Sequence, residues 1–204
     1  SIELTIYQTI SDHTNIVYSL AQYNDNEELL FSSSKDKYLN IYKLDDKHNF
    51  VLIQKLKKAA EKSGGEIGKV ITLSNKCLLS GDHKSLTIWK QKEDKKEVEY
   101  EDFYNILING ESCNLLEISP SYFVSTTSKG AIQIYKNEGK EYPLFGEIPN
   151  ILIHNSTTNG LAKINDKLFC VAGKEGYFYT VSVEPVEIKL KTRIDIKKDI
   201  FLFM

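Results

Sequence analysis

Residues 78–90 read LLSGDHKSLTIWK, and the fold depends on whether this stretch recurs along the chain. It consists of two short apolar runs joined by a polar turn, and it contains the only tryptophan, Trp89. Three other stretches share this plan: LLFSSSKDKYLNIYKL at 29–44, FVSTTSKGAIQIYKN at 123–137 and LFCVAGKEGYFYTVSV at 168–183. Each predicts two antiparallel strands joined by a tight turn, because alternating apolar residues flank a polar cluster.

The bulky residue that ends the second strand of each pair gives the repeat length. A shorter match, SIELTIYQ at 1–8, carries the same marker without the first strand. The marker positions are Tyr7, Tyr42, Trp89, Tyr135 and Val181, and they are 35, 47, 46 and 46 residues apart. A further apolar run precedes each complete pair and another follows it. Four strands per repeat of this length predict the blades of a β-propeller.

These repeats divide the chain into blade units of one propeller segment that spans residues 1–204. The complete units are 13–57, 66–108, 112–153 and 157–194, and partial units lie at 1–12 and 199–204. The predicted fold is therefore all-β, with four-stranded antiparallel blades. Neither face of such a sheet can be charged, because neighbouring blades cover both, and the strand Leu86–Trp89 fits this requirement.

The units resemble degenerate WD repeats. That family ends its third strand with Trp-Asp, where this chain has Trp89-Lys90, and it often places an aspartate six residues before the tryptophan. Asp36 holds that position before Tyr42, and His13 stands where the family has a histidine that bonds to it. The other turns carry His83, Lys129 and Glu175 instead.

The resemblance implies structural roles for His13, Asp36, Tyr42, His83, Trp89 and Tyr135. It implies a hydrogen bond between His13 and Asp36, packing of the marker aromatics between blades, and His83 in place of a turn aspartate or on the top surface. It also implies a partial ring from a seven-bladed propeller, with the missing blades supplied by further sequence or by another chain.

Composition narrows the range of partners. The chain is 41% hydrophobic and 26% charged with a net charge of −2, and Arg193 is its only arginine, so no strong attraction to nucleic acid is expected. The three cysteines, Cys77, Cys113 and Cys170, lie in apolar runs and predict buried thiols. No apolar run reaches the roughly 20 residues of a membrane span. We therefore expect a soluble cytoplasmic protein.

No catalytic, cofactor-binding or metal-binding motif is present, so neither a cofactor nor a metal is predicted. If the resemblance holds, partners contact the top face, through polar residues beside each turn and before each first strand. These are Thr14, Asn15, Lys35, Asp82, Ser128 and Lys174. The charged run at 90–102 predicts a solvated hairpin loop, with docking of a charged partner as the alternative.

The predicted function is a non-enzymatic scaffold that holds other proteins in a complex. One alternative is the substrate-recognition subunit of a ubiquitin ligase, which would need an adaptor-binding segment. Another is a propeller enzyme with a site in the central funnel. The fold by itself does not choose among them.

Overall fold

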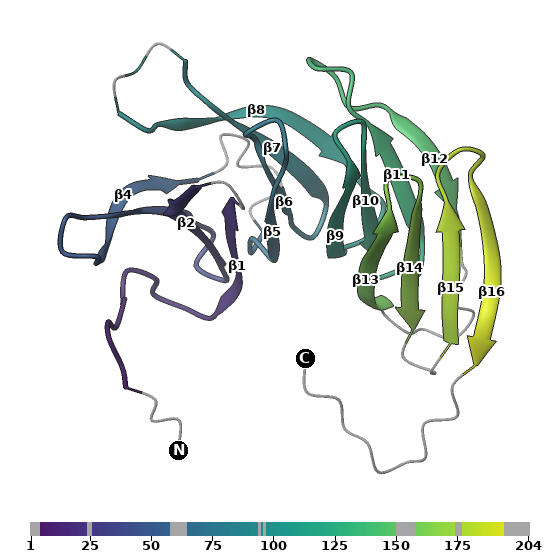
Figure 1. Cartoon of the computed structure of the whole chain (residues 1–204), viewed down its shortest axis with the longest axis horizontal. Coiled ribbons are helices and arrows are strands. Elements are labelled where there is room, and N and C mark those ends of the chain that lie inside the picture. Colours follow the sequence, from purple (N-terminus) through teal and green to yellow (C-terminus); the bar gives the residue numbers. More distant parts are fainter. Residues whose placement is uncertain are drawn as a thin grey trace. The chain divides into compact units, whose positions relative to one another are not determined.

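The computed structural model describes residues 5–23, 26–57, 65–93, 95, 97–149, 158–173 and 177–193. In these residues all regular structure is β: sixteen strands form four sheets, each built from four consecutive strands (Figure 1). The fold class predicted from the sequence is confirmed. The chain divides into two compact units, Ser1–Asp82 with Thr87–Asn105, and His83–Leu86 with Ile106–Met204.

The first sheet follows directly from the repeat around Tyr42. Its strands are β1 (Val17–Tyr23), β2 (Asn26–Ser34), β3 (Leu39–Leu44) and β4 (Phe50–Leu56). Neighbours in the chain are neighbours in the sheet, and all pairs are antiparallel. A tight turn joins β2 to β3, in which Lys37 takes a positive φ of 73° and the Tyr38 N–H donates to the Asp36 carboxylate at 3.1 Å. An aspartate is favoured here because its carboxylate accepts from the turn backbone.

The second sheet has the same order. Its strands are β5 (Lys69–Thr72), β6 (Leu78–Gly81), β7 (Ser85–Gln91) and β8 (Tyr100–Leu107). The quoted stretch 78–90 therefore covers β6 and nearly all of β7, as the second and third strands of one sheet. Its residues in β6 are all buried, in agreement with a sheet that is covered on both faces.

The third and fourth sheets repeat this arrangement. The third contains β9 (Ser112–Ser119), β10 (Tyr122–Thr127), β11 (Ile132–Lys136) and β12 (Leu144–Ile148). The fourth contains β13 (Thr158–Asn165), β14 (Leu168–Gly173), β15 (Tyr177–Ser182) and β16 (Glu187–Arg193). The four sheets thus cover residues 17–56, 69–107, 112–148 and 158–193 in turn.

The two partial units predicted at the ends of the chain have different outcomes. The stretch 1–8 was expected to include a third strand ending at Tyr7, but residues 5–8 form no strand and Tyr7 is 73% exposed. The described residues provide no second strand for this segment to pair with, and a strand needs a hydrogen-bonded neighbour. The expected partial unit at 199–204 falls outside the described residues.

One apolar core joins the first sheet to the second. Phe31 and Ile41 from the first sheet pack in the same cluster as Trp89 and Tyr100 from the second. The Phe31 ring meets the Tyr100 ring edge to face, with the centroids 5.7 Å apart. Trp89 is fully buried, and its indole N–H donates to the Ser80 hydroxyl at 2.9 Å. The marker tryptophan therefore contributes to the packing between sheets and has its one polar group satisfied.

A second core joins the third sheet to the fourth. Ile132 and Ile134 of β11 share a buried cluster with Phe169 and Val181, the marker of the fourth sheet. The Val186 side chain packs closely on Gly146 in β12, where an added Cβ would lie 2.8 Å from Val186 Cγ2. Only glycine leaves room for the Val186 side chain there.

Candidate functional site

His13 and Asp36 meet at the corner where the chain enters the first sheet. His13 Nδ1 lies 2.9 Å from Asp36 Oδ2, and His13 Nε2 lies 2.6 Å from the Ser32 hydroxyl. The Thr14 N–H also donates to Asp36 Oδ2, at 3.0 Å. The His13 imidazole thus connects Ser32 in β2 to Asp36 in the turn that follows. The Asp36 carboxylate also holds the segment before β1 through Thr14.

The hydrogen bonds decide the charge state of Asp36. Desolvation alone would raise the pKa of this carboxyl group, but donors on Thr14, His13 and Tyr38 act against it and the pKa is lowered overall. Hydrogen bonding to the ionised form favours that form. Asp36 is therefore a carboxylate at neutral pH.

The order Ser32–His13–Asp36 has the connectivity of a serine hydrolase triad, and accessibility decides what it can do. The His13 and Asp36 side chains are only 6% and 3% exposed, and Ser32 is 3% exposed. A nucleophile must reach the substrate carbonyl, and this hydroxyl lies inside the sheet. The arrangement is therefore structural: it holds the segment before β1 against β2 and the β2–β3 turn.

The other marker residues are also buried. Tyr42 is 2% exposed, and its hydroxyl accepts a hydrogen bond from the Asn40 amide at 3.0 Å. The Tyr135 hydroxyl donates to Gln133 at 3.0 Å, and its ring stacks on Phe123 with the centroids 5.1 Å apart. Burial, followed by the charge of Glu147, raises the pKa of Tyr135.

His83 was predicted either to replace the turn aspartate or to be exposed on the top surface. Its side chain is 42% exposed, and Nδ1 lies 2.8 Å from a carboxylate oxygen of Glu111. The backbone of Glu111, just before β9, is bound to the turn that follows β10. Its N–H donates to the Ser128 hydroxyl at 3.0 Å, and its carbonyl accepts from the Ser128 N–H at 2.9 Å. His83 therefore lies on the surface, beside the segment that leads into β9 of the third sheet.

Three of the predicted partner-binding residues lie together at the corner of the first sheet. Thr14 and Asn15 are exposed, and the Lys35 side chain is 42% exposed. The Lys35 ammonium group lies 3.2 Å from Glu66, which also accepts a hydrogen bond from the Tyr18 hydroxyl at 2.6 Å. We call Thr14, Asn15, Lys35 and Glu66 the first-sheet corner.

The prediction also named Asp82, Ser128 and Lys174. Asp82 is 3% exposed, so its side chain does not form part of the surface. Ser128 belongs to the other compact unit and is half-buried. Lys174 lies outside the described residues. Glu66 and Glu111 were not predicted, because both lie in connections between sheets, where no repeat pattern applies.

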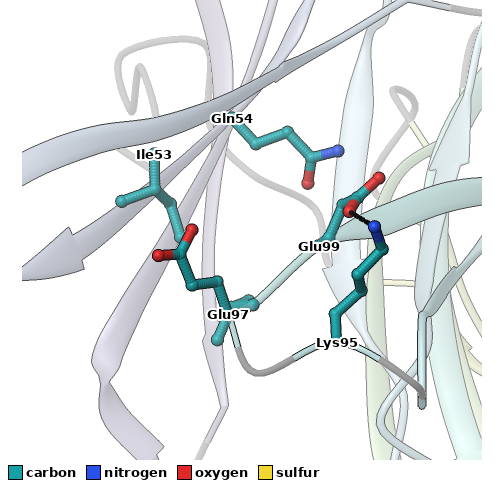
Figure 2. A pocket seen from close by; sticks show the side chains of 6 residues that line it. Ile53, Gln54, Lys95, Glu97 and Glu99 are labelled. Carbon is teal, nitrogen blue, oxygen red and sulfur yellow. Dashed lines mark ion pairs between the residues drawn. The ribbon is translucent and has the colours of Figure 1, made fainter.

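A shallow cavity of about 520 Å³ lies between β4 and the segment before β8 (Figure 2). Ile53 and Val98 give it an apolar side, while Glu97 and Glu99 give it an acidic side. Figure 2 shows Lys95 directed at Glu99, with the charged atoms 3.6 Å apart. Lys90 pairs with Glu93 at 2.9 Å in the same region. The charged run 90–102 thus pairs its own charges along much of its length.

Within the described residues, no group of three or more His, Cys, Asp or Glu side chains could hold a metal ion. The same residues include no helix that is long and apolar enough to cross a bilayer. Cys77 is buried, Cys113 and Cys170 are half-buried, and all three are free thiols. Burial, helped by the charge of Glu111, raises the pKa of Cys113 and keeps it protonated.

Comparison with known proteins finds no matching family model and no matching curated protein. Solved structures do match. Sqt1 from Chaetomium thermophilum aligns with a TM-score of 0.69 at 10% identity, over 84% of this chain and 45% of that one. Sqt1 from Saccharomyces cerevisiae aligns with a TM-score of 0.59 at 9% identity, over 93% and 65%. The C-terminal WD40 domain of Sif2 aligns with a TM-score of 0.65 at 9% identity, over 86% and 48%.

The chain thus spans about half to two thirds of the length of these structures. At such low identity the similarity concerns the fold, and it agrees with the sheet order and with the buried marker residues. The chain has the fold of a WD-repeat-like β-propeller segment.

Proposed function

We propose that this chain is a non-enzymatic scaffold that binds other proteins through the polar corners of its blades. The observation that carries the proposal is the first-sheet corner, where exposed polar groups stand on a braced backbone. The Thr14 N–H is held by Asp36, the Asn15 carbonyl accepts from the Ser34 hydroxyl at 3.3 Å, and the Lys35 N–H donates to Ile16 at 2.9 Å. A surface ordered in advance loses little entropy when a partner binds.

The chemistry of this corner suits a protein or peptide partner. Lys35 and Glu66 supply opposite charges that remain partly exposed, and Thr14 and Asn15 add neutral polar groups. Polar rims of this kind give specificity and orientation more than raw affinity. The exposed Ile16, at 58%, and Tyr18, at 42%, border the corner and supply the apolar area that such a contact also needs.

Three further points support a scaffold over an enzyme and a site of action inside the cell. The triad-like arrangement of Ser32, His13 and Asp36 is buried, so a substrate cannot reach its hydroxyl group. The WD40 domains that this chain resembles in fold are typically interaction scaffolds. Three free cysteines fit a reducing compartment, and we infer that the protein acts in the cytoplasm.

The test is affinity purification of the full-length product followed by mass spectrometry, with two variants beside the wild type. Thr14→Arg combined with Lys35→Glu reverses charge and adds bulk at the corner, while Lys140→Glu changes an exposed lysine in the connection between β11 and β12. We expect the corner variant to lose specific partners at unchanged thermal stability and the Lys140 variant to keep them. An identical partner set for all three proteins would remove this corner from the binding surface.

A further inference from the structure

Glu97 lines the cavity beside β4 and differs from the other glutamate there, Glu99 (Figure 2). Glu99 forms ion pairs with Lys92 and with Lys95, the latter at 3.6 Å. Glu97 is exposed and forms no ion pair within the described part of the chain. The cavity therefore presents one carboxylate whose charge is not balanced by a lysine of the described residues.

The apolar side of the cavity is held in place by the first and second sheets. Ile53 of β4 is 41% exposed, and Val98 packs against the core that joins the two sheets. Gln54 links β4 to the start of β8: its Nε2 donates to the Tyr100 carbonyl and its Oε1 accepts from the Tyr100 N–H, both at 2.8 Å. The walls of the cavity are thus connected before any ligand binds, which lowers the entropy cost of binding.

A second glutamine makes the same contact one repeat earlier in the chain. Gln8 Nε2 donates to the Phe50 carbonyl at 2.8 Å, and Gln8 Oε1 accepts from the Phe50 N–H at 2.9 Å. Phe50 is the first residue of β4, as Tyr100 is of β8. Gln8 and Gln54 therefore occupy corresponding places.

The residues that precede these two glutamines, Tyr7 and Ile53, make different contacts. The Tyr7 hydroxyl donates to the Lys47 carbonyl at 2.9 Å, so that it reaches the connection between β3 and β4. Ile53 has a shorter side chain without a donor, and it lines the cavity that lies before the connection between β7 and β8. A tyrosine thus bridges the first place, while an isoleucine leaves the second one open.

We propose that this cavity binds an arginine side chain from a basic segment of a partner protein. The aliphatic stem of the arginine lies on Ile53 and Val98, and its guanidinium group pairs with the Glu97 carboxylate. Long basic side chains cover apolar surface with their stems, and a guanidinium group can form two parallel hydrogen bonds with one carboxylate. The cavity shares no residue with the first-sheet corner, so it is a second contact surface that does not depend on that corner.

The test is fluorescence anisotropy of a labelled hexa-arginine peptide with the full-length gene product, and a hexa-glutamate peptide serves as the control ligand. Glu97→Gln removes the charge at nearly constant shape and should weaken hexa-arginine binding about three- to fivefold, the effect of losing one partly exposed ion pair. Glu141→Gln changes another exposed glutamate, in the connection between β11 and β12, and should leave the affinity unchanged. The Thr14→Arg, Lys35→Glu variant should also bind the peptide as the wild type does, which separates this test from that of the corner.

A second variant closes the cavity and leaves its charges in place. Ile53→Tyr introduces the residue type that stands at position 7, and it should weaken hexa-arginine binding about tenfold or more, because the ring takes the space of the arginine stem. Equal affinity of the wild type, Glu97→Gln and Ile53→Tyr would overturn the proposal, and so would equal binding of hexa-glutamate or no binding of hexa-arginine by the wild type. If Ile53→Tyr does not fold, the comparison of Glu97→Gln with Glu141→Gln decides by itself.

Discussion

His13 and Asp36, which are 23 positions apart, are joined by a 2.9 Å hydrogen bond that holds the entry of the first sheet against its β2–β3 turn. The contact connects the segment before β1 to the turn in which Asp36 stands where WD repeats often have an aspartate. Both side chains are buried, so the bond forms away from competing water. This hydrogen bond explains why the first-sheet corner has an ordered backbone although its side chains are exposed.

Replacing Asp36 by Asn should destabilise the protein by about 1–3 kcal/mol at neutral pH, because buried donors lose a charged acceptor. The acid dependence should change as well. The pKa of Asp36 is lowered on folding, so its contribution is complete above the ordinary value of 3.8 and is lost as the pH falls through the lower folded value. Urea denaturation between pH 3 and pH 7 measures both effects.

Asp46→Asn is the control for this prediction, because Asp46 is exposed in the turn that follows β3. This substitution should leave the urea midpoint as it is in the wild type at each pH. If the Asp36→Asn variant had the same free energy of unfolding as the wild type at every pH, the hydrogen bonds to Asp36 would not contribute to stability.

Trp89→Ala should cost about 3–5 kcal/mol, the usual loss for a large buried aromatic side chain. Trp89 is fully buried in the core between the first two sheets, and the Ser80 hydroxyl would lose its donor as well. Chemical denaturation measures the loss. Val51→Ala, at a residue that is 48% exposed, serves as the control with little expected change. A loss of the same small size at both positions would contradict the packing described for Trp89.

Tyr122 should make the protein sensitive to alkaline pH. Its hydroxyl donates to the Glu184 carboxylate, and this bond, followed by desolvation, raises the pKa of Tyr122 to about 12. A raised folded pKa stabilises the protein below the unfolded value of about 10, and that stability is lost as the pH rises toward 12. Tyr122→Phe should lower stability at pH 8 and flatten its decline between pH 10 and 12. An unchanged decline would assign the alkaline sensitivity to other groups.

Gly146→Ala should destabilise the second compact unit by about 1–3 kcal/mol through overpacking. The added methyl group would lie 2.8 Å from Val186 Cγ2, so the Val186 side chain or the backbone of β12 must shift. Val186→Ala in the same chain should restore part of the loss. A double-mutant cycle by denaturation measures this coupling. Additive effects of the two substitutions would show that β12 and the fourth sheet do not meet at this point.

The sequence predicted the strands and the buried marker residues because both follow from local alternation repeated at a fixed period. Tyr42, Trp89 and Tyr135 are all buried near the ends of third strands, and each of the four sheets is built from four consecutive strands. The expected third strand that ends at Tyr7 is different: residues 5–8 form no strand, because a strand needs a hydrogen-bonded neighbour and the described residues provide none for this segment.

The candidate site was less predictable, because its chemistry depends on contacts between distant connections. Glu66 reaches Lys35 and Tyr18 from the segment before β5, and no periodicity marks its position. Asp82 and His83 are adjacent in one turn, yet the first is buried and the second is exposed. Such a difference depends on which way the turn faces, and composition does not encode that direction.

The most direct test of this account is the environment of the single tryptophan, measured by nuclear Overhauser effects from the Trp89 indole. If successive four-stranded sheets pack face to face, the indole should show contacts with Phe31 and Ile41 of the first sheet, together with its own Ser80. Contacts confined to residues of the second sheet, or an indole open to solvent, would contradict the blade packing on which the proposed scaffold depends.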